Sequence, residues 1–170
     1  MHKHVALRLL FCAAGAASAM ALAVFAAGEL ASPFLLASIG GTAVFLFGLT
    51  RAPAAQPRAL FGGHLGGALV GIACYQAFGE SLPVYALAIA LALVLMLATR
   101  TVHPPAGANP VIMVNMHAGW SALWHPVLLS IGVLVLVAVV WSRLYPGLVR
   151  YPVEPFAPSP PKLDWGGWDS

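Results

Sequence analysis

The chain has 170 residues, of which 61% are hydrophobic and 8% are charged, against roughly 25% charged residues in typical soluble domains. So few charges cannot cover a soluble domain of this size, and the composition therefore predicts an integral membrane protein. The net charge of +3 comes without basic clusters interleaved with aromatic residues, which excludes a nucleic-acid-binding surface.

Five apolar runs are long enough for membrane-spanning helices, each of which needs roughly 20 largely apolar residues. They cover residues 5–27, 33–50, 58–79, 83–100 and 123–143. The first run also resembles a signal peptide, since Lys3 and Arg8 lie at its start and Ala17-Ser18-Ala19 resembles a cleavage site. Because four more runs follow it, we expect the first run to be retained as a helix.

A shorter apolar segment, residues 105–119, would be about 22 Å long as a helix. Lys and Arg gather on the cytoplasmic side of membrane proteins, and all loop arginines lie on one side only if this segment also crosses. These arginines are Arg51, Arg58, Arg100, Arg143 and Arg150. The sequence therefore predicts an all-α polytopic membrane protein with five full transmembrane helices plus a short or half helix. Both termini would be cytoplasmic in a bacterial inner membrane, and a re-entrant hairpin at 105–119 is the alternative.

The chain changes character after residue 145, so residues 1–145 form one predicted transmembrane domain. Six prolines between residues 146 and 161 prevent a long helix and favour extended backbone. We expect residues 146–170 to form a proline-rich, mostly disordered tail, with Trp165 and Trp168 at the membrane interface.

The stretch TRTVHPPAGANP, residues 99–110, interrupts the apolar chain and predicts a new helix start at its prolines. The N–H groups that follow the prolines would be free and would carry partial positive charge, which attracts an anion. An arginine, a histidine and an amide flank this start. A loop that merely joins two helices is the alternative. The candidate anion-binding residues are Arg100, His103, Pro104, Pro105, Ala106, Gly107 and Asn109.

A weak internal repeat relates this break to an upstream segment. Residues 50–64 (TRAPAAQPRALFGGH) and 99–117 (TRTVHPPAGANPVIMVNMH) both begin with Thr-Arg, and both contain an amide, a proline and a histidine seven residues later. Transporters often place their binding sites at such repeats, although chance similarity in a chain of low diversity is the alternative. The repeat adds four candidate site residues: Gln56, Arg58, His64 and His117.

The apolar runs contain no Asp or Glu, whereas cation carriers usually place carboxylates within their spans. An anion is therefore the expected cargo, and histidines would permit proton coupling. The chain shows no metal-site spacing and no hydrolase motif, so we expect no metal, no cofactor and no catalysis. Cys12 and Cys74 lie in apolar runs and are expected to pack as small hydrophobic residues.

Glycines recur every four residues at Gly63, Gly67 and Gly71, and further glycines occur at Gly40, Gly41 and Gly48. Small residues at this spacing let helices approach closely. We expect these faces to pack helices together, with a homo-oligomer as one outcome.

Three motifs resemble the HPP family of integral membrane proteins: ASIGGTAVFLFG (37–48), QPRALFGGHLGGALVG (56–71) and HPPAGA (103–108). The resemblance covers about residues 5–145, and the family is usually described with four spans, fewer than we predict. It implies transport, because plastid and cyanobacterial relatives are associated with nitrite movement.

We therefore expect transport of a small inorganic anion, with nitrite as the first candidate, through a site at the helix breaks around the HPP motif. A non-transporting membrane scaffold or partner subunit is the alternative, since glycine-rich faces and a proline-rich tail suit it equally well. The expected partners are the lipid bilayer, the anion and a second copy of the chain.

Overall fold

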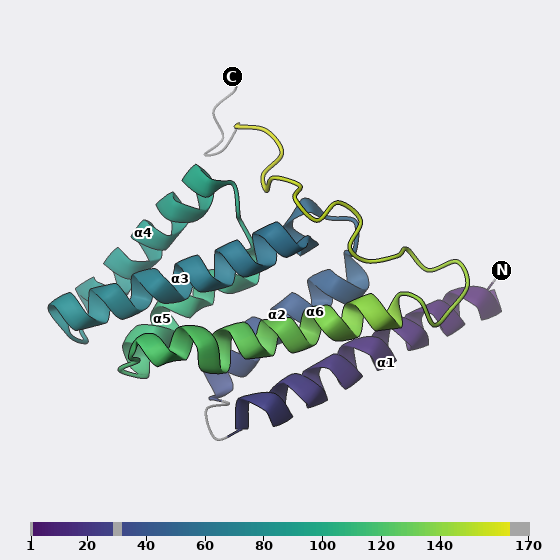
Figure 1. Cartoon of the computed structure of the whole chain (residues 1–170), viewed down its shortest axis with the longest axis horizontal. Coiled ribbons are helices and arrows are strands. Elements are labelled where there is room, and N and C mark those ends of the chain that lie inside the picture. Colours follow the sequence, from purple (N-terminus) through teal and green to yellow (C-terminus); the bar gives the residue numbers. More distant parts are fainter. Residues whose placement is uncertain (1, 29–31, 164–170) are drawn as a thin grey trace.

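The computed structural model describes residues 2–28 and 32–163, and the regular structure in these ranges is helical apart from one isolated bridge (Figure 1). The α-helices are α1 (His2–Ala27), α2 (Pro33–Gly48), α3 (Pro57–Phe78), α4 (Leu82–Thr99), α5 (Asn109–Asn115) and α6 (Leu129–Trp141). The short helical turns are η2 (Pro53–Ala55), η3 (Pro104–Ala108), η4 (Trp120–Leu123) and η5 (Trp124–Leu128). The predicted all-helical class is confirmed.

Prolines and left-handed residues set the helix boundaries. Prolines occupy the first turns of α2, α3 and α4, where a missing N–H costs nothing. Ser32 caps α2 by accepting a hydrogen bond of 3.2 Å from the Leu35 N–H. Gly79 ends α3 with a φ of 72°, and Arg100 ends α4 with a φ of 53°.

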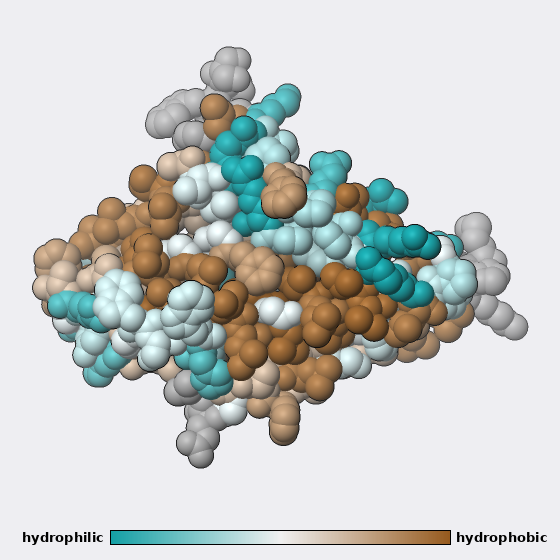
Figure 2. Space-filling model, in the orientation of Figure 1, coloured by the Kyte–Doolittle hydropathy of each residue, from teal (hydrophilic) through white to brown (hydrophobic). Residues whose placement is uncertain are grey.

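Three helical segments in the described residues are long and apolar enough to cross a membrane: Val5–Ala27, Leu82–Thr99 and Trp120–Trp141. The predicted number of five full spans is not confirmed, because α2 is apolar but has only 16 residues, and the glycines of α3 lower its hydropathy. Large apolar side chains point outward, among them Phe25 (86% exposed) and Leu82 (83%), and apolar residues dominate the middle of the surface (Figure 2). Such a surface fits lipid and not water.

The helices run back and forth between two ends of the molecule (Figure 1). One end, called here the arginine end, joins Arg58 to Pro155 and Arg100 to Ser159 by backbone hydrogen bonds. The opposite end joins His117 to Glu80, and the His125 side chain to the Ala26 carbonyl. The segment from η3 through α5 carries the chain from the arginine end to the opposite end. The predicted short helix after the HPP motif is therefore present. It runs from one end of the molecule to the other instead of turning back.

The glycine face of α3 packs against the chain's own η3 and α5. A Cβ added at Gly67 would stand 2.9 Å from the Ala106 carbonyl oxygen, and one at Gly71 would stand 2.6 Å from the Pro110 carbonyl oxygen. Small residues therefore serve close packing inside one chain, and this face is covered. Of the α2 glycines, Gly40 and Gly48 face open space, so an oligomer through that helix stays a prediction.

The proline-rich tail differs from its prediction. Residues 146–163 form no helix, as their prolines predict, but their turns and bends lie along the arginine end instead of being disordered. Tyr151 is 1% exposed and donates a hydrogen bond of 2.9 Å to the Ala55 carbonyl, and Ser159 pairs with Thr101 in a parallel bridge. These buried contacts hold this part of the tail in place, whereas its composition alone predicted disorder. Trp165 and Trp168 lie outside the described residues.

Candidate functional site

Two histidines from distant parts of the chain meet at one buried hydroxyl. Thr42 Oγ1 on α2 lies 2.8 Å from His64 Nε2 on α3 and 2.9 Å from His103 Nε2 in the segment before η3. The imidazole ring centroids are 5.1 Å apart. None of the three side chains is more than 1% exposed. A polar centre therefore lies where the predicted helix break meets α2 and α3.

Further polar groups surround these three residues. The Asn109 amide donates to His64 Nδ1 and to the His64 carbonyl, both at 3.0 Å, and its oxygen accepts from Ser38 Oγ at 2.9 Å. His103 Nδ1 lies 2.7 Å from the carbonyl oxygen of Ala54. We call Ser38, Thr42, His64, His103 and Asn109 the histidine cluster. Its members satisfy one another, as buried polar groups must.

The hydrogen-bond partners show which atoms of the histidine cluster carry hydrogens when both imidazoles are neutral. Because the Ala54 carbonyl only accepts, His103 Nδ1 carries its hydrogen, and His103 Nε2 then accepts from the Thr42 hydroxyl. Thr42 Oγ1 in turn accepts from His64 Nε2–H, and His64 Nδ1 accepts from Asn109. The Ser38 carbonyl, 3.1 Å from Thr42 Oγ1, is the competing acceptor for the hydroxyl hydrogen. The cluster is thus a directed chain of hydrogen bonds from Asn109 to Ala54.

Glycines on α2 and α3 allow residues 103–105, the HPP motif, to pack closely against both helices. A Cβ at Gly41 would stand 3.1 Å from the Pro105 ring, and one at Gly63 would stand 3.0 Å from the His103 Cβ. Ser38 Oγ also lies 3.0 Å from the Pro105 carbonyl oxygen. The close approach of three segments therefore depends on the glycines of both upstream motifs.

The predicted cationic and amide residues at the arginine end hold the tail. Arg58 donates to the Phe156 carbonyl at 3.4 Å and to the Thr99 carbonyl at 2.9 Å, and Arg100 donates to the carbonyls of Pro160 and Pro161. Gln56 Oε1 accepts from the backbone N–H groups of Val153 and Glu154. These three residues lie around the arginine end and not in the histidine cluster.

A family model described as "HPP, transmembrane region" matches residues 1–152. The chain belongs to the HPP transmembrane family. The predicted membership is thereby confirmed, and the protein is an integral membrane protein.

Two curated relatives of this HPP protein are transmembrane proteins of Dictyostelium discoideum. One is 37% identical over 97 residues, which cover 54% of this chain and 31% of the relative. The other is 33% identical over 114 residues, which cover 62% of this chain and 40% of the relative. The aligned part thus spans about a third of the length of these relatives. No solved structure matches the chain significantly.

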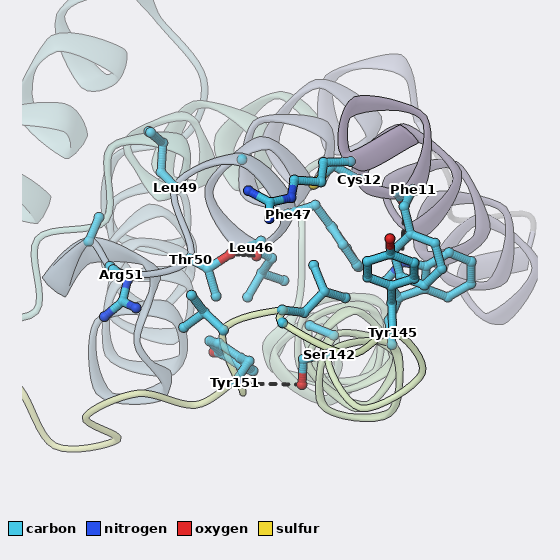
Figure 3. A pocket seen from close by; sticks show the side chains of 18 residues that line it. Phe11, Cys12, Leu46, Phe47, Leu49, Thr50, Arg51, Ser142, Tyr145 and Tyr151 are labelled. Carbon is cyan, nitrogen blue, oxygen red and sulfur yellow. Dashed lines mark hydrogen bonds between the residues drawn. The ribbon is translucent and has the colours of Figure 1, made fainter. Parts of the chain in front are cut away.

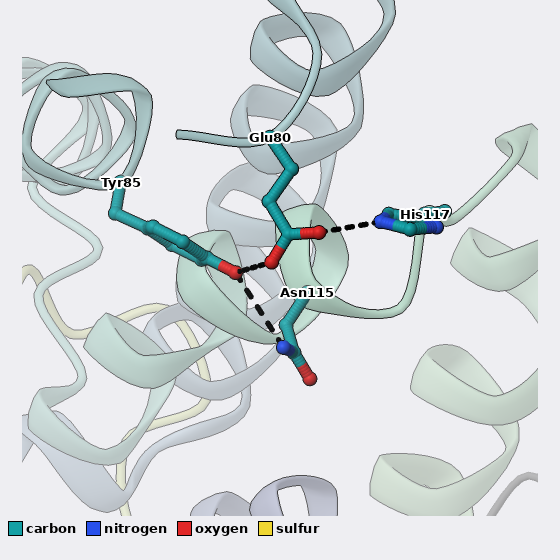
Figure 4. Close-up of polar contacts among 4 residues, drawn as sticks. All are labelled: Glu80, Tyr85, Asn115 and His117. Atoms are coloured by element: carbon teal, nitrogen blue, oxygen red, sulfur yellow. Dashed lines mark hydrogen bonds and ion pairs between the residues drawn. The ribbon is translucent and has the colours of Figure 1, made fainter. Parts of the chain in front are cut away.

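His117 lies away from the histidine cluster, at the opposite end of this HPP domain (Figure 4). Its Nε2 lies 2.6 Å from Glu80 Oε2, and its side chain is 56% exposed. The Tyr85 hydroxyl donates to the same carboxylate. The hydrogen bond from Tyr85, and then the one from His117, lower the pKa of Glu80 below its ordinary value of 4.5. The sequence similarity between His64 and His117 therefore does not extend to a shared environment.

The predicted start of a regular helix with free N–H groups at the HPP prolines is wrong. The chain forms a 3-10 turn at the HPP prolines, and the Ala106 N–H donates to the His103 carbonyl at 2.9 Å. α5 begins only at Asn109 and has seven residues, too few for a strong dipole. Pro104 and Gly107 are exposed, and they contribute no group to the cluster.

The sequence placed His64, His103 and Asn109 among the candidates but missed Thr42, Ser38 and the Ala54 carbonyl. Ser38 and Thr42 are four residues apart, so they share one face of an otherwise apolar helix, and this spacing was an available signal. A backbone carbonyl from a separate loop has no such signal. No group of three His, Cys, Asp or Glu side chains in the described residues could hold a metal ion.

Proposed function

We propose that this HPP domain transports a small inorganic anion, with nitrite as the first candidate, across a bacterial inner membrane with both termini in the cytoplasm. The observation that carries the proposal is the histidine cluster: two fully buried imidazoles that share one hydroxyl inside a membrane protein. Neither histidine has a carboxylate among its described hydrogen-bond partners. Such a centre suits a dehydrated anion better than a cation.

The competing acceptor at Ser38 supplies a way to couple an anion to a proton. If His103 gained a proton at Nε2, its N–H and that of His64 would both point at Thr42 Oγ1, and the hydroxyl would turn to the Ser38 carbonyl. The cluster would then carry one positive charge without a counter-charge, and burial makes that state costly. An accompanying anion would offset this cost. Transport is the proposed role, and it includes no catalytic step.

A flux assay tests the proposal. Purified protein in liposomes should carry nitrite in a panel with nitrate, formate and chloride, faster with an inward proton gradient. His103→Ala and Thr42→Val should reduce the flux at least tenfold, because each interrupts the hydrogen-bond chain. Thr42→Ser should retain it, and His125→Ala, an exposed histidine at the opposite end, is the matched control. Flux equal to that of empty liposomes for the whole panel would refute transport.

A non-transporting scaffold is the second candidate. It is favoured by the closure of the histidine cluster, whose members are at most 2% exposed, and which lines neither of the two described cavities. A scaffold would show no anion flux in any variant and would co-purify with one stable partner. These outcomes separate the two roles.

A further inference from the structure

A cavity of about 490 Å³ lies at the arginine end, between α1, α2, α6 and the start of the tail (Figure 3). Its walls are mainly apolar and aromatic. Phe11 packs against Trp141 and Tyr145, with ring centroids 4.8 Å and 5.3 Å away, and Leu46 and Phe47 of α2 complete the lining. No residue of the histidine cluster lines this cavity, so the two sites are separate.

Two arginines, Arg8 and Arg51, line the same cavity and give it a positive side. Both are exposed, and the described contacts include no hydrogen bond or ion pair for either. Arg58, Arg100 and Arg143, by contrast, all donate to backbone carbonyls. Among the residues that the structure describes, no Asp or Glu lines the cavity. The cavity thus combines an apolar interior with two uncompensated guanidinium groups.

We propose that this cavity binds an anionic phospholipid. The cavity lies where α1, α2 and α6 reach the arginine end, which is the level of the headgroups if α1 and α6 span the bilayer. Basic pockets between transmembrane helices at this level suit lipid phosphates. Arg8 and Arg51 would bind the phosphate, and an acyl chain would fill the aromatic part. The absence of lining carboxylates disfavours a choline headgroup.

Size separates this ligand from a free anion. A water molecule takes up roughly 30 Å³ in the liquid, and a small inorganic anion is of similar size, so it would leave most of 490 Å³ unfilled. A small inorganic anion would also make no favourable apolar contact with the walls of the cavity. A ligand with both a phosphate and a hydrocarbon chain satisfies both halves of the site.

Lipid retention tests the proposal. The full chain, delipidated in a neutral detergent, should retain phosphatidylglycerol in native mass spectrometry and gain thermal stability from it, but not from phosphatidylcholine. Arg8→Gln with Arg51→Gln should weaken this preference by about fivefold per arginine, roughly 25-fold in all. Lys162→Gln removes an exposed charge that does not line the cavity and should leave the preference unchanged.

A further variant and its control test the apolar part of the cavity without changing the charge of the protein. Gly48 lines the cavity, and nothing lies within 4 Å of where its Cβ would stand, so Gly48→Leu can fill space without a clash. It should reduce retention of phosphatidylglycerol, whereas Gly40→Leu, on the same helix and outside the cavity, should not. Equal binding of both lipids by the wild type would overturn the proposal. So would equal stabilisation by inorganic phosphate alone, which would indicate a free-anion site.

Discussion

At the scale of single residues, the histidine cluster shows how one hydroxyl organises two imidazoles. Among the described residues, the Thr42 hydroxyl is the one partner that the Nε2 atoms of His64 and His103 share, and it accepts from one while donating to the other in the neutral state. The sequence predicted both histidines as site residues because they occur in polar motifs. It did not predict their common partner, because Thr42 is a single hydroxyl in an otherwise apolar helix, and the motif that contains it was noted for its glycines.

Replacing Thr42 with valine should lower the free energy of unfolding by about 1–3 kcal/mol, because it leaves a buried donor and a buried acceptor without partners. Thr42→Ser keeps the hydroxyl and loses one methyl group, so it should cost about 1 kcal/mol. Reversible SDS unfolding in mixed micelles measures both. If Thr42→Val, which keeps the methyl group, cost nothing while Thr42→Ser did, packing of the methyl, and not the hydroxyl, would stabilise the site.

The exposed pair of Glu80 and His117 makes a pH-dependent contact between the α3–α4 turn and the end of α5 (Figure 4). Because the hydrogen bond from Tyr85, and then the one from His117, lower the pKa of Glu80 in the folded protein, these contacts stabilise the fold above the ordinary value of 4.5. This stabilisation is lost as the pH falls through the lower folded value. Glu80→Gln should therefore lower the melting temperature at pH 7, and this difference from the wild type should shrink as the pH falls below 4.5.

Glu154→Gln is the control for this titration, since Glu154 is exposed and its carboxylate has no described partner. The difference between the two variants at pH 7 isolates the pair from general charge effects. A Glu80→Gln penalty that did not shrink as the pH fell below 4.5 would contradict the assignment of the stabilisation to the carboxylate.

At the scale of helices, prolines, glycines and apolar runs predicted the elements well. The runs at 33–50, 58–79 and 83–100 became α2, α3 and α4, each within two residues at either end. The start of the passage at residues 105–119 was predicted less well, because a 3-10 turn and a helix both begin naturally at proline. Sequence alone does not choose between them. The choice depends here on packing against Gly41, Gly63 and Gly67.

The glycine face of α3 supplies the prediction at this scale. Gly71→Ala would place a Cβ 2.6 Å from the Pro110 carbonyl oxygen and 2.7 Å from its Cα, so α5 would have to shift. We expect a loss of about 1–3 kcal/mol in unfolding free energy. Gly40→Ala is the matched control, because its Cβ meets nothing within 4 Å and alanine favours a helix by roughly 0.5–1 kcal/mol. If Gly71→Ala were as stable as Gly40→Ala, the α3–α5 contact would not be tight.

At the scale of the whole molecule, charge predicted a feature that hydropathy did not. Hydropathy finds three long spans, but the distribution of arginines predicted that residues 105–119 also cross. The structure joins the regions of Arg58, Arg100 and the tail at one end, which requires an even number of passages. The tail itself was mispredicted, because its contacts come from Tyr151 and Ser159, and composition says nothing about which partners such residues will find.

Cysteine labelling tests this arrangement in the membrane. In a background with Cys12→Ala and Cys74→Ala, single cysteines replace Arg51, Ser121 and Arg150, all of which are exposed. If α5 crosses, Arg51 and Arg150 lie on one side and Ser121 on the other, since two passages separate residue 51 from the HPP motif. A membrane-impermeant maleimide on intact cells should then label only Ser121→Cys, and all three after permeabilisation. A re-entrant α5 would instead place Ser121 with Arg51 and leave Arg150 on the opposite side, so the pattern of labelling decides the path of the half helix.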